Sequence, residues 1–253
     1  MHAPLQSLGY MSVKQNISVN DRVIVALDVE TVQEAKSVVS ELGALANFYK
    51  IGMQLQFNGG IDYAEQLANE GKKVFLDSKL FDIRNTVEKT VERISNMGVT
   101  FLTVHGDKPV IESAVRAKRN QLQILAVTFL TSLDEHDLRD MQINMSLEDF
   151  VLFRAKMAIS AGADGVIASG LESARIRQKA GSQLKIITPG IRPQGTARDD
   201  QRRITTPRQA IEDGADYLVI GRPILTAVSK TDMLRRILAE VREALQCRQS
   251  AQN

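Results

Sequence analysis

The stretch Lys73-Val74-Phe75-Leu76-Asp77-Ser78-Lys79-Leu80-Phe81-Asp82 places a short apolar run directly before two carboxylates and an ammonium. A continuous apolar run of this length predicts a strand buried on both faces, as in a parallel sheet. Alternate residues of a strand share a face, so we expect Asp77 and Lys79 to point the same way. Charges beside a buried strand are rarely left unpaired. The cluster is therefore either a structural ion pair or a place where chemistry occurs.

Seven further apolar runs occur along the chain and alternate with segments of helical periodicity. The expected strands are 22–28, 48–51, 73–77, 100–105, 123–128, 165–168, 185–188 and 216–220. The expected helices are 32–42, 61–69, 87–97, 110–118, 147–160, 173–179, 208–212 and 232–245. Each strand is thus followed by one helix.

This alternation predicts a single-domain α/β fold, the TIM (β/α)8 barrel, because crossovers through helices make neighbouring strands parallel. A weak internal repeat supports one repeating unit, since Ala161-Gly162-Ala163-Asp164 resembles Asp213-Gly214-Ala215-Asp216. A doubly wound open sheet is the alternative. We expect the barrel to span 21–247, with a loose extension over 1–20 and a frayed end over 248–253.

The composition restricts the class of partner. The chain has 253 residues, 43% of them hydrophobic, and a formal net charge of +2 with both signs well mixed. The sequence has no stripe of Lys and Arg residues of the kind that marks a nucleic acid or an anionic membrane as partner. No apolar stretch approaches the roughly 18 residues of a membrane span, and the start lacks the apolar core of a signal peptide. We therefore expect a cytoplasmic protein with a small-molecule ligand.

Metal and nucleotide motifs are not visible in the sequence. The single cysteine, Cys247, cannot form an internal disulfide, and the histidines His2, His105 and His136 have no metal-ligand spacing. No glycine-rich segment has the spacing of a dinucleotide-binding or phosphate-binding loop. We expect neither a metal ion nor a cofactor.

Polar residues gather where the expected strands end, and in a barrel those ends form the active-site face. The strand-end residues are Asp28, Lys50, Asp77, Lys79, His105 and Thr131. A single strand-end aspartate is more often a cap or turn residue. The set as a whole favours a functional site.

The connection 189–206 is long for an α/β protein, and such loops are usually functional or disordered. In barrels the loops after strands seven and eight commonly hold a phosphate group. Gly221 permits close backbone approach and Arg222 offers a two-pronged donor, although Arg222 covering the barrel rim is the structural alternative. The leading ligand is a phosphorylated small molecule.

Over residues 23–244 the chain resembles the orotidine 5′-phosphate decarboxylase family of the bacterial type. The matching segments are Val25-Ala26-Leu27-Asp28, Lys50-Ile51-Gly52, Asp77-Ser78-Lys79-Leu80-Phe81-Asp82-Ile83-Arg84-Asn85-Thr86, Leu130-Thr131-Ser132, Thr188-Pro189-Gly190-Ile191-Arg192-Pro193-Gln194-Gly195 and Val219-Ile220-Gly221-Arg222. The resemblance implies a homodimer that converts orotidine 5′-phosphate to UMP and CO2 in de novo pyrimidine biosynthesis without a cofactor.

The resemblance also implies the catalytic residues. Lys79 would donate a proton to C6 of the pyrimidine, within an alternating charge network of Lys50, Asp77, Lys79 and Asp82. Asp82 and Thr86 would reach across the dimer interface into the partner's site.

Substrate contacts follow from the same resemblance. Asp28 would bind the ribose, and Thr131 would lie near the pyrimidine. The phosphate and the closing loop would be contacted by Arg192, Gln194, Gln201, Gly221 and Arg222. Two positions depart from the family pattern, because Ser78 stands where an apolar residue is common and Arg84 where proline is common. We expect activity to survive both changes.

The implied reaction explains why these charges are needed. Loss of CO2 from C6 leaves a carbanion with little delocalisation, so an enzyme without a cofactor must stabilise the charge and then protonate it. Asp77 and Asp82 would keep the Lys79 ammonium charged in a partly dry site. Asp77 would also repel the substrate carboxylate, by roughly 4 kcal/mol for unit charges about 4 Å apart at an effective dielectric near 20. We expect the lysine to make the larger contribution.

Two alternatives stay open. A metal-dependent barrel, such as a 3-keto-gulonate-phosphate decarboxylase or a hexulose-phosphate synthase, shares the Asp-x-Lys-x-x-Asp spacing but holds Mg2+ with additional carboxylates, and Lys50 disfavours this choice. A non-catalytic barrel would bind UMP without turnover, but it has no reason to keep Lys79 between two aspartates.

Overall fold

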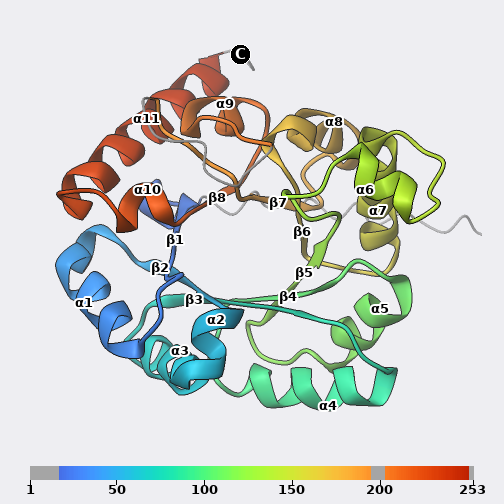
Figure 1. Ribbon diagram of the computed structural model, residues 1–253, viewed down its shortest axis with the longest axis horizontal. Helices are drawn as coiled ribbons and strands as arrows, with labels where there is room; N and C mark the ends of the chain where they lie inside the picture. The colour runs from blue at the N-terminus through green and yellow to red at the C-terminus, as the bar shows by residue number, and fades with distance from the viewer. Residues whose placement is uncertain (1–16, 195–202, 251–253) are drawn as a thin grey trace, which may run out of the picture.

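The computed structural model describes residues 17–194 and 203–250, and these form a closed parallel barrel surrounded by helices (Figure 1). The strands follow one another around the barrel in chain order, and β8 pairs with β1 to close it. The expected TIM barrel is confirmed. Because the sheet is closed, the doubly wound open sheet is excluded.

The strands lie where the apolar runs predict them. Their bounds are β1 (Val23–Ala26), β2 (Phe48–Gly52), β3 (Lys73–Leu80), β4 (Phe101–His105), β5 (Gln123–Val127), β6 (Gly165–Ile167), β7 (Lys185–Thr188) and β8 (Tyr217–Ile220). The largest difference concerns β3, which continues past Asp77 to Leu80. The charged residues interrupt the apolar pattern but not the strand, since they are paired within the barrel.

The predicted helices are also present. They are α1 (Val32–Leu42), α3 (Ile61–Asn69), α4 (Arg84–Ser95), α5 (Lys108–Ala117), α7 (Leu147–Ser160), α8 (Gly170–Ala180), α9 (Pro207–Glu212) and α11 (Lys230–Ser250). The short elements α2 (Met53–Leu55), α6 (Glu135–Asp140), α10 (Arg222–Leu225) and the π-helical turn η3 (Gln56–Gly60) were not predicted. Helix α11 packs against α9 and α1 (Figure 1). None of the helices in the described part of the chain is long and apolar enough to cross a membrane.

Two apolar layers make up the core, one between the strands and the helices and one inside the barrel. The inner layer consists of Ile24, Ala26, Phe48, Phe75, Phe101, Leu125, Val127, Ile167, Ile187, Tyr217 and Val219. Since alternate strand residues share a face, the inward Phe48 places Lys50 inside, and the inward Phe75 places Asp77 inside. Lys79, further along β3, also lines the cavity. The charged residues therefore lie above this apolar floor, at the C-terminal ends of the strands.

The opposite end of the barrel uses the repeated Gly-Ala-Asp segments. Asp164 accepts a hydrogen bond from the Ile124 N–H at 2.7 Å and pairs with Lys118 at 2.6 Å. The second repeat places Asp216 in the same arrangement, with the Ile186 N–H at 2.9 Å and a guanidinium from α8. The repeat is thus a structural device that ties a strand to its neighbour.

Candidate active site

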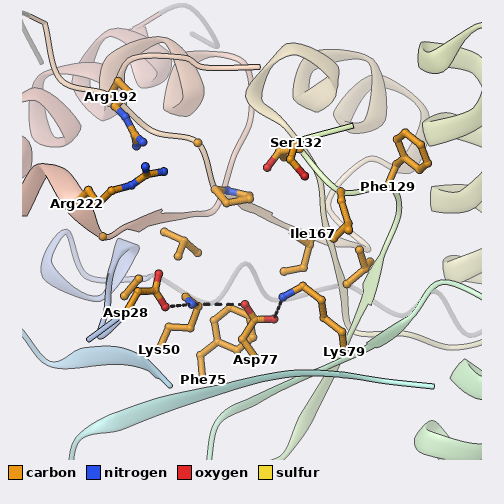
Figure 2. A pocket seen from close by; sticks show the side chains of 18 residues that line it. Asp28, Lys50, Phe75, Asp77, Lys79, Phe129, Ser132, Ile167, Arg192 and Arg222 are labelled. Carbon is orange, nitrogen blue, oxygen red and sulfur yellow. Dashed lines mark hydrogen bonds and ion pairs between the residues drawn. The ribbon is translucent and has the colours of Figure 1, made fainter. Parts of the chain in front are cut away.

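A cavity of about 480 Å³ opens at the C-terminal end of the barrel, which we call the mouth (Figure 2). Its walls come from six of the eight strands, β1, β2, β3, β5, β6 and β8, and from the loops after β1, β5, β7 and β8. The lining residues are Ala26, Asp28, Lys50, Phe75, Asp77, Lys79, Val127, Phe129, Leu130, Thr131, Ser132, Ile167, Pro189, Gly190, Arg192, Val219, Gly221 and Arg222. The fold therefore brings together most of the site residues predicted from sequence.

Four of these residues form a continuous chain of alternating charge (Figure 2). The Lys50 Nζ lies 2.7 Å from Asp28 Oδ1 and 3.6 Å from Asp77 Oδ2. The Lys79 Nζ lies 2.8 Å from Asp77 Oδ1. Asp77 therefore binds both ammonium groups, one through each carboxylate oxygen.

The electrostatic balance keeps the central pair ionised. Burial by itself would raise the pKa of Asp77, but the ammonium groups of Lys50 and Lys79 and the hydrogen bonds it accepts hold that pKa below its usual value. Burial would likewise lower the pKa of Lys50, yet the carboxylates of Asp28 and Asp77 raise it above its usual value. Each charge is therefore retained because its neighbour has the opposite sign.

Gly52 makes room for this network. A Cβ atom at this position would lie 2.8 Å from Asp28 Oδ1 and 2.9 Å from Lys50 Nζ, which is closer than such contacts allow. A side chain at this position would force the Asp28 carboxylate or the Lys50 ammonium to move, so glycine leaves the ion pair its present geometry.

Arg192 and Arg222 lie across the cavity from Lys79 (Figure 2). Arg192 is buried, and its backbone N–H donates to the Thr205 carbonyl at 2.9 Å. The Thr205 N–H in turn donates to the Gly190 carbonyl at 3.3 Å, so the two ends of the connection after β7 are joined. Arg222 follows Gly221 and opens α10. The mouth thus presents two guanidinium groups opposite the lysine and carboxylate chain.

The cavity has an apolar floor that was not predicted, formed by Ala26, Phe75, Val127, Ile167 and Val219, and Phe129 lies on its wall. The signal was present, because each floor residue occupies an inward strand position. Without the barrel geometry these residues read as ordinary core.

Asp82, Thr86 and Gln194 are exposed and do not line the cavity of their own chain. Asp82 accepts a hydrogen bond from the Ile83 N–H at 2.7 Å, directly before α4. The backbone carbonyl of Gln194 accepts a hydrogen bond from the Arg236 side chain at 2.8 Å. Gln201 lies outside the described residues.

The two departures from the family pattern face away from the cavity lining. The Ser78 hydroxyl donates to Gln56 Oε1 at 2.9 Å, on the side of β3 that faces the helices, as the strand alternation predicts. Arg84 is the first residue of α4 and is exposed. Neither side chain is part of the charge chain.

A (β/α)8 barrel with lysines and carboxylates on one side of its mouth and two arginines on the other belongs to the class of barrels that hold small phosphorylated ligands. Comparison with known proteins makes the class specific. Residues 21–237 match the family described as "Orotidine 5'-phosphate decarboxylase / HUMPS family". The chain therefore belongs to the orotidine 5′-phosphate decarboxylase family.

Individual relatives agree with this assignment. The orotidine 5′-phosphate decarboxylase of Nitrobacter winogradskyi is 44% identical over 226 residues, which cover 89% of this chain and 94% of the relative. That of Afipia carboxidovorans is 47% identical over 222 residues, covering 87% and 94%. The crystal structure of orotidine 5′-phosphate decarboxylase from Lactobacillus acidophilus superposes with a TM-score of 0.77 at 36% identity, covering 87% of this chain and 98% of that one.

Proposed function

We propose that this chain catalyses the decarboxylation of orotidine 5′-phosphate to UMP and CO2 in de novo pyrimidine biosynthesis, without a cofactor and with Lys79 as the proton donor to C6. The observation that carries this proposal is the position of Lys79. Its ammonium lines the cavity, 2.8 Å from Asp77 Oδ1 and across from the two arginines. A ligand whose phosphate is held by the arginines would present its far end to this lysine.

The chemical step balances with the residues present. The bond between C6 and the carboxylate carbon breaks, CO2 leaves, and the electron pair stays on C6. Lys79 then transfers one proton to C6 and becomes a neutral amine, which regains a proton from solvent. Before the transfer, the positive charge of Lys79 stabilises the forming carbanion. Asp77 places a negative charge against that ammonium, and its repulsion of the substrate carboxylate is relieved when CO2 departs.

The remaining lining residues suit the other parts of the substrate. Arg192 and Arg222 would bind the phosphate through paired N–H donors, with the Gly221 backbone close by. Asp28 would accept hydrogen bonds from the ribose, and Thr131 would lie beside the pyrimidine. Gln194 and Gln201 would complete the loop that closes over the phosphate, whose binding energy can contribute to catalysis.

We also infer that the active form is a homodimer to which Asp82 and Thr86 contribute across the interface. Two observations support this. The chain exposes large apolar side chains after β2 and β3, among them Phe57 at 87%, Ile83 at 72% and Phe81 at 67% exposure. Asp82 lies in the same segment and outside its own cavity. A second copy of the chain would cover the apolar residues and receive the carboxylate.

A spectrophotometric assay of orotidine 5′-phosphate consumption tests the activity. Lys79→Ala is expected to lower kcat by about 10³-fold or more, because general-acid catalysis and charge stabilisation are lost together. Lys73→Ala is the matched control, since Lys73 lies on the same strand and pairs with Asp21 at the opposite end of the barrel. Near-wild-type turnover in Lys79→Ala would refute the assigned role.

EDTA distinguishes this reaction from the metal-dependent alternative. Among residues 17–194 and 203–250 no three His, Cys, Asp or Glu side chains gather as metal ligands would. We expect turnover to be unchanged after EDTA treatment and dialysis, whereas loss that Mg2+ restores would favour the alternative.

The shared site is tested by mixing subunits. Lys79→Ala and Asp82→Ala are each expected to be inactive alone. In a re-equilibrated mixture, one site of each mixed dimer would have both residues intact. About a quarter of wild-type activity is therefore expected, from one intact site in two within half of the dimers. A mixture that stays inactive would argue against the shared site.

A further inference from the structure

The backbone around the active-site lysine departs from regular strand pairing. Leu76 on β3 lies opposite Leu102 on β4, and the next pair is Leu80 opposite Val104. Residues 77–79 of β3 thus share the space of a single β4 residue, Thr103. The irregularity is a bulge, a feature that is over-represented next to active sites because it re-aims side chains.

Within this bulge the backbone of Lys79 adopts an unusual conformation. Its φ of +47° lies in the left-handed region, which is unfavourable for a residue with a Cβ atom. The bulge also takes the Lys79 N–H out of the regular ladder. Something outside the strand backbone must therefore satisfy this group and hold the conformation.

Thr103 does both with one hydroxyl. The Thr103 side chain is fully buried at 0% exposure, and its Oγ1 accepts a hydrogen bond from the Lys79 N–H at 3.0 Å. The same hydroxyl donates to Asp77 Oδ1 at 2.8 Å. The direction is unambiguous, because a backbone N–H can only donate and an ionised carboxylate can only accept.

The two bonds meet where the chemistry is proposed to occur. Asp77 Oδ1, which receives the Thr103 hydroxyl, also receives the Lys79 ammonium at 2.8 Å. Thr103 therefore binds the backbone of Lys79 directly. It also binds the Asp77 carboxylate, which in turn orients the ammonium at the end of the Lys79 side chain. A β-branched residue suits this position, since its restricted χ1 fixes the direction of the hydroxyl.

We propose that Thr103 is a positioning residue for the decarboxylation, which sets the Lys79 ammonium against C6 by anchoring both the bulge and the Asp77 carboxylate. It acts through the other two residues and not on the substrate. The inference rests on the proposed role of Lys79 as proton donor.

Substitution of the hydroxyl tests the proposal. Thr103→Val keeps the shape and removes both hydrogen bonds, so kcat should fall about 10- to 100-fold, with KM within about threefold of wild type. Thr103→Ser restores the hydroxyl and should recover kcat to within about threefold. The control is Thr128→Val, a buried threonine whose hydroxyl donates to the Ile167 carbonyl at 2.8 Å and not to a charged group.

A second readout isolates proton transfer from decarboxylation. The C6 hydrogen of UMP should exchange with D2O through Lys79, and proton NMR measures the rate. We expect Thr103→Val to slow this exchange by the same factor as kcat and Thr128→Val to leave it unchanged. A purely structural role would lower the melting temperature without a matching loss of exchange. Thr103→Ala provides the same test if valine prevents folding.

The outcomes separate the two proposals. If Thr103→Val and Thr103→Ala keep kcat and exchange within twofold of wild type while Lys79→Ala is inactive, the role of Thr103 is refuted and that of Lys79 stands. A serine variant as slow as the valine variant would also refute the positioning role. If Lys79→Ala itself turns over normally, the proposed proton donor is wrong, and the inference about Thr103 falls with it.

Discussion

Carboxylates bind cations at both ends of the barrel, but the paired charges serve a structural role at one end and face a cavity at the other. At the N-terminal end, Asp164 and Asp216 each bind a backbone N–H and a cation from the surrounding helical layer. At the mouth, Asp77 binds a hydroxyl and the ammonium groups of Lys50 and Lys79, which come from the strands themselves. The first arrangement joins neighbouring strands. The second presents a charge to a cavity.

The two ends differ in how many hydrogen-bond donors of each cation are already used within the protein. The Arg177 side chain, which pairs with Asp216, also donates to the carbonyls of Gly181, Leu184 and Gly214, so its donors are used within the framework. Lys79 has three donors, and among the described contacts its ammonium gives one of them, to Asp77. A cation with donors remaining, at the edge of a 480 Å³ cavity, is suited to a ligand. Removing carboxylates at the two ends should therefore affect different quantities.

The largest effect is expected from Asp77→Ala at the mouth. Without this carboxylate, Lys79 loses both its counter-charge and the acceptor that orients it, so kcat/KM should fall about 10³-fold or more. Steady-state kinetics measures the loss. Asp77→Asn keeps the shape and should be nearly as inactive if charge is the cause. Activity within tenfold of wild type in either variant would contradict the proposed difference between the two ends of the barrel.

Asp216→Asn tests the opposite end, and here stability should change while activity does not. Loss of a charge-assisted hydrogen bond costs about 1.5–3 kcal/mol, which corresponds to roughly 3–12 °C in melting temperature for a domain of this size. Thermal unfolding followed by circular dichroism measures it. The control is Asp213→Asn in the same repeat, since within residues 17–194 and 203–250 the Asp213 side chain accepts a single, exposed hydrogen bond, from Gln209 at 2.9 Å. A large loss of kcat in Asp216→Asn would contradict the division between the two ends.

The dependence of stability on pH gives a smaller effect at the mouth. The pKa of Asp77 in the folded protein lies below its usual value of 3.8, so the fold favours the ionised form. Its contribution is present above the unfolded pKa and is lost as the pH falls through the folded one. The difference in unfolding free energy between wild type and Asp77→Asn should therefore be constant from about pH 7 to pH 5 and change below about pH 4. Urea unfolding at several pH values measures it, and a change centred near pH 6 would contradict the assignment.

The barrel was predictable from sequence because burial imposes a repeated pattern on strands and helices. The prediction that Asp77 and Lys79 share a face followed from strand alternation. The bulge did not, because it depends on the register between β3 and β4, and Thr103 in the run Phe101–His105 reads as an ordinary strand former. Asp82 shows that closeness in sequence can also mislead. Its spacing from Lys79 suggests that the two side chains lie close together, but the chain turns outward at Phe81.

The smallest effect is expected from Ser78→Ala, between the two residues that matter most at the mouth. The Ser78 hydroxyl faces the helices and donates to Gln56, so its loss should cost about 0.5–1.5 kcal/mol of stability and leave kcat within twofold. Gln56 is only partly buried, and water can replace the lost donor. A double-mutant cycle with Gln56→Ala isolates the pair in thermal unfolding. If Ser78→Ala instead lowered kcat tenfold, the helix-facing side of β3 would also take part in positioning Lys79. Catalysis would then depend on both faces of the strand at the mouth, and not only on the face that lines the cavity.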